Sequence, residues 1–190
     1  PTNDLPQNTQ VYVLIDSGAF KDAANNNYAG ISSTTALSFT TGDQTAPTLT
    51  SNSPANNATG ITLNSNIQLT FSENVTAVAL KNITIKKTSD NSVIETIAAN
   101  NTSLVSISNN VVTINPTNDL PQNTQVYVLI DSGAFKDAAN NNYTGISSKT
   151  AFSFTTGDQT APTLSSSVPA DNATGVTQRS EEHTSELQSP

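Results

Sequence analysis

The feature that most constrains the fold of this chain is an internal repeat. Residues 1–28 return, letter for letter, as residues 116–143. When residues 1–62 are aligned with residues 116–177, 54 positions are identical and 8 differ. Such a period has to be recognised before any other pattern is interpreted, because it sets the size of the folding unit. The sequence therefore predicts a tandem array with a period of 115 residues.

The length of the period decides between two kinds of repeat protein. A unit of 115 residues is large enough to be a domain with its own core, whereas solenoid units of roughly 20–50 residues must stack on one another. We therefore expect independent domains in series. Residues 1–44 are the C-terminal part of a first repeat, residues 45–159 are a complete repeat, and residues 160–178 supply the first strand of a third.

The last twelve residues, 179–190, do not belong to the repeat. Their letters RSEEHTSELQS resemble the conceptual translation of a short-read sequencing adapter. We interpret them as a non-native tail and exclude them from the reasoning on fold and function. The only arginine (Arg179) and the only histidine (His183) are excluded with them, and the rest of the chain carries 6 lysines against 12 acidic residues.

Short strand patterns fill the complete repeat. Residues 66–72 alternate apolar and polar side chains, which predicts a half-buried antiparallel strand. The β-branched and aromatic run VYVLI, at 11–15 and again at 126–130, predicts a buried strand. Further strands are predicted at 36–42, 48–54, 82–87, 92–98, 103–108, 111–114 and 150–156. With no convincing helix, the pattern predicts an all-β antiparallel sandwich with Greek-key connections.

Turn-forming residues predict how the strands are connected. Asn109-Asn110 predicts a two-residue hairpin turn. The letters PANNATG at 54–60 predict a turn, and AFKDAA at 134–139 leaves room for one helical turn inside a loop. Pro47 and the polar residues before it predict a short, stiff linker between repeats.

Four motifs and their order along the chain resemble those of a bacterial Ig-like domain of the type found in the S-layer protein SbsA. The motifs are TAPT at 45–48, PANNATG at 54–60, LTFSENV at 69–75 and GAFKD at 133–137. The resemblance covers the chain up to residue 178. It implies tandem Ig-like β-sandwiches in a secreted or surface-anchored bacterial protein, with a structural or adhesive role and no catalysis.

Two positions depart from the pattern of that family. Asn140 stands where the family has a glycine, and asparagine can adopt the same left-handed conformation at some cost. Val126 takes the place of the tyrosine that the family has near the start of its strand, and Tyr127 faces the other way. The sequence therefore argues against a tyrosine-corner hydrogen bond.

Composition excludes several function classes. The formal charge is −8, and 6 lysines with one arginine make no basic stripe, so nucleic acid and anionic membranes are not expected partners. No apolar run approaches the ~20 residues of a membrane span, and the absence of cysteine rules out disulfides and thiolate metal sites. Without the tail there is no histidine for a Ser/His/Asp or Cys/His site. No acidic residue has a sequence context that indicates a raised pKa, so we predict no enzymatic activity.

Calcium is the only metal that the sequence favours, because hard cations bind carboxylate, carbonyl and amide oxygens. Such groups gather in the linker sequence GDQTAP and in the loop after residue 130. The alternative is that they cap turns and bond to the local backbone, and no EF-hand spacing is present. The candidate ligands are Glu73, Asp131, Asp137, Asn140 and Asp158, with Asp43 as the linker counterpart of Asp158 and Asn141 beside Asn140.

Three functions remain open at this point. The first is a structural stalk that projects a distal element from a bacterial surface or secreted protein, needs no cofactor, and has neighbouring repeats as partners. The second is an adhesive or carbohydrate-binding module that contacts a cell-surface glycan or protein through its loops. The third is an accessory domain of a secreted enzyme. The loops are repeated as faithfully as the strands, which fits a spacer or an array of weak identical sites.

Overall fold

The computed structural model of the chain describes residues 4–177. The chain divides into two units, Pro1–Asp158 and Gln159–Pro190. In the second unit, residues 159–177 are exposed and form no strand, so the first strand predicted at 160–178 is not observed over the described part of that range. The predicted tail, 179–190, lies outside the described residues. Within 4–177 no helix is long and apolar enough to cross a membrane.

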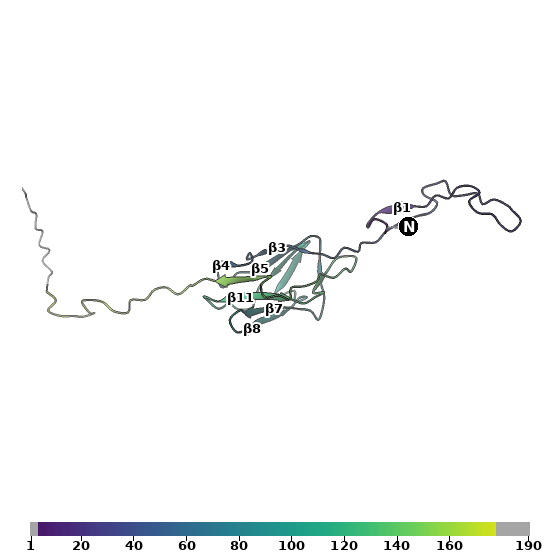
Figure 1. Cartoon of the computed structure of the whole chain (residues 1–190). Helices are drawn as coiled ribbons and strands as arrows, with labels where there is room; N and C mark the ends of the chain where they lie inside the picture. The colour runs from purple at the N-terminus through teal and green to yellow at the C-terminus, as the bar shows by residue number, and fades with distance from the viewer. Residues whose placement is uncertain (1–3, 178–190) are drawn as a thin grey trace, which may run out of the picture. The chain divides into compact units, whose positions relative to one another are not determined.

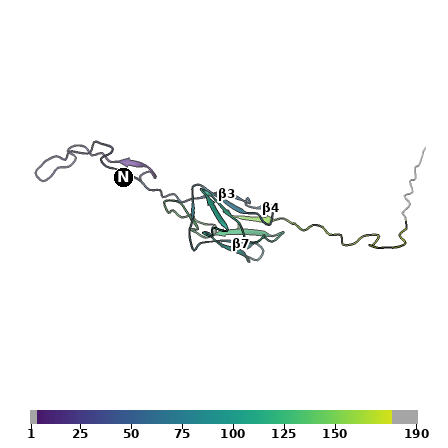
Figure 2. The same ribbon diagram turned by 180° about the vertical axis from the view of Figure 1, so that it is seen from behind.

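The complete repeat is a sandwich of two sheets (Figure 1). One sheet has the strand order β3-β5-β10-β9 and the other has the order β4-β13-β11-β7-β8. Figure 2, seen from behind, shows β3 and β7 again in different layers. The strands are β3 (Leu49–Ser53), β4 (Ala58–Ile61), β5 (Ile67–Phe71), β6 (Thr76–Ala77), β7 (Asn82–Lys87), β8 (Val93–Ala98), β9 (Val105–Ser108), β10 (Val111–Ile114), β11 (Gln125–Ile130), β12 (Phe135–Lys136) and β13 (Ser153–Thr156). The all-β fold class predicted from strand patterns is confirmed.

The core lies between the two sheets and follows the alternation in the sequence. Ile67, Leu69 and Phe71 of β5 are at most 1% exposed, as their period of two predicts. Phe71 also reaches the ring of Phe135, with centroids 5.4 Å apart, and the edge of Tyr143 at 5.1 Å. Other members of the core are Ile83, Ile85, Ile97, Val112, Ile114, Val126, Val128, Ile130, Phe152 and Phe154.

Three local expectations agree with the structure. Asn109 has a φ of 54° in the turn that joins β9 to β10, where Val111 pairs with Ser108. Asn140 has a φ of 71°, the left-handed conformation expected where the family has glycine. Tyr127 turns away from Val126, and its hydroxyl donates to the side-chain oxygen of Asn91 at 3.2 Å.

Two local expectations are wrong. The turn predicted over 54–60 ends at Asn57, because β4 begins at Ala58 and pairs in parallel with β13, so the sandwich is not antiparallel throughout. The side chain of Asn56 holds this pair, because its oxygen accepts from the Ser153 amide at 2.9 Å and its amide donates to the Thr150 carbonyl at 3.2 Å. The segment 134–139 forms no helical turn; β12 pairs there with β6.

The N-terminal copy of the repeat keeps its pairing but not its burial. Its strands β1 (Gln10–Tyr12) and β2 (Ser38–Thr40) pair in the same register as β11 and β13. The run VYVLI at 11–15, predicted to be buried, is largely exposed in this copy and buried in the second. Burial depends on the strands that cover a segment, and no strand of the described residues covers the first copy.

The chain enters and leaves the complete repeat at opposite ends (Figure 1). At the end where it enters, the Thr48 amide donates to the Ser72 hydroxyl just after β5, at 3.0 Å. At the end where it leaves, the Gly157 amide donates to the Ile61 carbonyl before β5 begins, at 2.8 Å. Because β5 crosses the sandwich between these points, Thr48 and Gly157 lie at opposite ends of the complete repeat.

Candidate functional site

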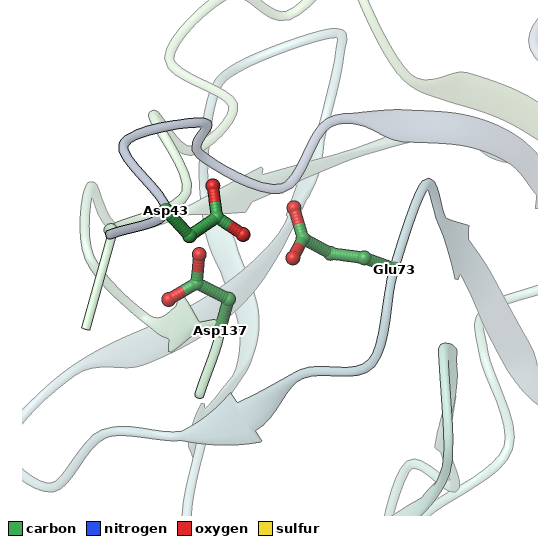
Figure 3. A group of neighbouring side chains, drawn as sticks. All are labelled: Asp43, Glu73 and Asp137. Atoms are coloured by element: carbon green, nitrogen blue, oxygen red, sulfur yellow. The ribbon is translucent and has the colours of Figure 1, made fainter. Parts of the chain in front are cut away.

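Three carboxylates meet at the end of the sandwich where the chain enters (Figure 3). Asp43 comes from the linker before β3, Glu73 from the segment after β5, and Asp137 from the loop after β12. One oxygen of each lies within 4.8 Å of the others. Segments separated by as many as 94 positions therefore point their negative charges at a single place.

Asp137 is fixed by the loop that contains it. The side chain is only 3% exposed, and the backbone amide and side-chain amide of Asn141 each donate to it at 2.7 Å. The left-handed Asn140 turns the chain so that Asn141 can do this. Burial opposes ionisation, but the hydrogen bonds from Asn141 and from the amides of Ala139 and Asn140 outweigh it and lower the pKa of Asp137.

Glu73 has the opposite tendency. It is half-buried, and removal from water raises its pKa, to which the charges of Asp137 and Asp43 add. The sequence showed no acidic residue in a context that raises a pKa, and this expectation is wrong for Glu73. The pKa of Glu73 is raised first by removal from water and then by two acidic residues that are remote in the sequence and become its neighbours in space, and a local sequence pattern shows neither cause.

Asp43 belongs to a linker that is held against the repeat it precedes. Its carboxylate accepts from the Thr45 amide at 2.8 Å. The Asn141 side chain donates to the carbonyl oxygens of Asp43 and Thr45 at 3.3 and 3.4 Å, and Pro47 is buried. Asn141 therefore contacts both the linker and Asp137, and it orders the two sides of the cluster together.

The other predicted ligands lie elsewhere. Asp131 is exposed and accepts from the Asn82 amide at 2.8 Å, which ties the end of β11 to β7. Asn140 is exposed and accepts from the Lys136 ammonium at 2.7 Å. Asp158 follows Gly157 at the end where the chain leaves. The structure thus brings together only Glu73 and Asp137 of the five, and adds Asp43.

The arrangement suits charge attraction better than proton transfer. Three carboxylates with inward-facing oxygens attract a hard divalent cation, which would lower the mutual repulsion that raises the pKa of Glu73. The described residues 4–177 contain no histidine that could act as a general base and no cysteine that could act as a nucleophile. They also contain no arginine that could stabilise a developing anion. Exposed acidic groups also gather without any ion, so the geometry alone assigns no metal.

The family model of the bacterial Ig-like domain matches residues 43–156, more than half of the chain. The chain belongs to the bacterial Ig-like domain family. The match begins at Asp43 and ends at the last residue of β13, so the linker aspartate falls within the Ig-like domain that it precedes. Ig-like domains of this family are typical of bacterial surface proteins and are generally non-catalytic. No curated protein matches the chain.

Proposed function

We propose that this Ig-like domain is a spacer in the stalk of a bacterial surface or secreted protein, in the manner of S-layer-like modules, and that tandem copies project a distal element. One observation carries the proposal: the chain enters the sandwich beside Ser72 and leaves it beside Ile61, at opposite ends. Domains joined in this way add length with each copy.

The linker supports the same role. Residues 43–47 are held by Asn141 and by the turn at Asp43, and Pro47 restricts the backbone further. A linker fixed to the following domain leaves few joints between domains. This differs from a Gly/Ser tether, which behaves as a flexible coil.

The spacer role is tested by solution scattering from one, two and three consecutive complete repeats. The maximum dimension is expected to grow by an equal increment with each repeat. An increment well below the first, as in a flexible or folded-back string, would overturn the spacer proposal. Binding of the same proteins to a glycan array or to host-cell protein would instead favour the adhesive alternative, and a catalytic domain in the same reading frame would favour the accessory one.

We also propose that Asp43, Glu73 and Asp137 bind calcium and so stiffen the linker. The supporting observation is that the three oxygens converge from three segments, one of which is the linker itself. A cation at this place would join residue 43 to the loop after β12. Calcium is favoured over softer metals because every candidate ligand atom is oxygen.

Thermal unfolding of residues 43–158 in millimolar calcium, and in chelator, tests this second proposal. Calcium is expected to raise the midpoint, since a ligand that binds only the folded state stabilises it. Asp43→Asn and Glu73→Gln should abolish the rise, whereas Asp131→Asn, a loop aspartate outside the cluster, should keep it. Identical melts with and without calcium would leave these residues as turn formers, with the spacer role unaffected.

A further inference from the structure

The linker residue Thr45 is bonded to groups that come from both sides of it in the sequence. Its backbone amide donates to the Asp43 carboxylate at 2.8 Å. Its hydroxyl donates to the side-chain oxygen of Gln7, in the copy before the linker, at 3.0 Å. Its carbonyl oxygen accepts from the side-chain amide of Asn141, in the complete repeat, at 3.4 Å. One linker residue therefore contacts both copies of the repeat.

The oxygen of the Gln7 side chain accepts a second bond from the linker. The backbone amide of Gln44 donates to it at 2.6 Å. A carboxamide oxygen has two lone pairs, so it can accept from Gln44 and Thr45 at the same time. Two successive donors of the linker thus share one acceptor, which lies 37 and 38 positions earlier in the chain.

The turn that carries Gln7 is itself fixed to the strand that leads into the linker. Thr41 directly follows β2. Its hydroxyl donates to the Pro6 carbonyl at 2.5 Å and accepts from the Thr9 amide at 3.0 Å. Thr156 holds the corresponding turn of the complete repeat through the same bonds. The Gln7 side chain therefore extends toward the linker from a backbone of defined position.

The two side chains that hold the linker use different groups of it. Gln7 accepts from donors of residues 44 and 45, whereas Asn141 donates to the carbonyl oxygens of residues 43 and 45. Since no group is shared, the two sets of bonds are compatible and fix the same three residues together. Rotation of one copy against the other about residues 43–45 has to break one of the two sets.

We propose that Gln7 and Asn141 are positioning residues that close a joint between consecutive repeats, with Thr45 bonded between them. The proposal rests on the spacer role given above and adds to it the residues that limit rotation at each linker. The fixed linker then belongs to both domains, so the preceding domain is held as well as the following one. The residues of the preceding side recur 115 positions later, as Gln122, Gln159 and Thr160.

Nuclear spin relaxation in the full chain tests the joint. Residues 4–42 and residues 49–156 are expected to share one rotational correlation time. Gln7→Ala and Thr45→Val each remove one partner of the same bond, so each should separate the two correlation times, with the shorter one in residues 4–42. Gln7→Ala should also speed exchange of the Gln44 amide by about fivefold, as loss of one hydrogen bond predicts.

The linker offers two matched controls. Thr45→Ser keeps the hydroxyl that donates to Gln7, and Thr48→Val removes an exposed hydroxyl from the same short segment. Both variants should keep the common correlation time. Because Gln7→Ala and Thr45→Val break one and the same bond, combining them should change the correlation times little more than the larger single effect.

Three results would overturn the joint. They are separate correlation times in the unaltered chain, a common correlation time that survives Gln7→Ala, and additive effects of Gln7→Ala and Thr45→Val. The spacer proposal fails differently. Equal scattering increments with separate correlation times would leave the spacer and remove the joint, whereas unequal increments with a common correlation time would do the reverse.

Discussion

Glu73 shows how one side chain links the cluster to stability. Its pKa is raised above the ordinary 4.5, by removal from water and by Asp137 and Asp43. A carboxyl group with a higher pKa in the folded state binds more protons there than in the unfolded state, so ionising it destabilises the fold. This loss begins as the pH rises through 4.5 and is complete above the raised pKa of the folded protein.

Replacing Glu73 with glutamine should remove that loss. We expect Glu73→Gln to raise the unfolding midpoint in chelator at pH 7 by roughly 2–4 °C, and the gain should vanish below the ordinary pKa of glutamate. Midpoints measured from pH 3.5 to pH 8 check this. Asp119→Asn, at an exposed acidic residue outside the cluster, is the control. A gain of the same size for both variants would mean that net charge alone is responsible.

Gly145 is required at its position for two separate reasons. Its φ is 85°, and a Cβ there would lie 2.5 Å from the Ile130 carbonyl oxygen and 2.8 Å from the Ser132 amide. We expect Gly145→Ala to lower the free energy of unfolding by about 3 kcal/mol or more. Gly60→Ala has a similar φ of 71° but no atom within 4 Å, so it should lose only ~1–2 kcal/mol. Denaturant titration of both variants separates the two effects, and equal losses would contradict the clash.

At the scale of elements, strands with an apolar alternation were predictable and strands held by partners were not. The sequence predicts β5 and β7 because every second residue is apolar and faces the core. These residues are Ile67, Leu69 and Phe71 in β5, and Ile83 and Ile85 in β7. β4 has no such pattern: its letters ATGI follow a turn-forming run. It becomes a strand because β13, almost a hundred residues away, pairs with it and because the neighbouring Asn56 bonds to Ser153. A local pattern cannot contain that information.

The role assigned to Asn56 gives a prediction for the β4–β13 pair. Asn56→Ala removes the acceptor of the Ser153 amide and the donor to the Thr150 carbonyl. We expect a loss of about 1–3 kcal/mol, as for a partly buried group left without its partner. Hydrogen exchange should speed up in β4 and β13 before it does in β5. Asn64→Ala, at an exposed loop residue, is the control, and uniform acceleration in all strands would contradict a local clamp.

The candidate site was predictable in composition but not in membership. The sequence placed acidic residues in the linker and in the loop after β11, and Glu73 and Asp137 do meet. It did not separate Asp43 from Asp158, which stand in identical GDQTAP segments. Only the direction of the chain through the sandwich does so, because the linker before β3, not the one after β13, lies beside Glu73. Asp131 was a candidate by proximity in sequence, but the Asn82 amide binds it instead.

At the scale of the whole molecule, the stability of the chain resides in one repeat. The continuous core belongs to residues 49–154, whereas matching aromatic side chains of residues 4–42, such as Phe20 and Phe39, are exposed. Exposed apolar groups contribute little to the free energy of unfolding, because they stay in water in both states. Residues 4–42 therefore add no second cooperative unit to the one formed by the complete repeat.

Calorimetry of the full chain should show this division directly. A single transition is expected, with an enthalpy of about 80 kcal/mol near 60 °C, the value for roughly 115 ordered residues. Folding of all described residues would give about 120 kcal/mol instead. Residues 43–158 alone should reproduce both the midpoint and the enthalpy. A large drop on removing residues 1–42 would show that the first copy contributes to the cooperative fold.

The chain enters the complete repeat at Thr48 and leaves it at Gly157, at opposite ends of the sandwich. These positions decide how tension passes through the domain. A pull on Thr48 and Gly157 acts along the strands, so the hydrogen bonds of β3 with β5 and of β4 with β13 are loaded together, in shear. Bonds loaded together must break together, which slows forced unfolding, a process governed by the unfolding rate. Single-molecule pulling should therefore give a high rupture force, and Asn56→Ala should reduce it. If the domain serves as the spacer proposed above, it would unfold only above a threshold force set by the pairing of β3 with β5 and of β4 with β13.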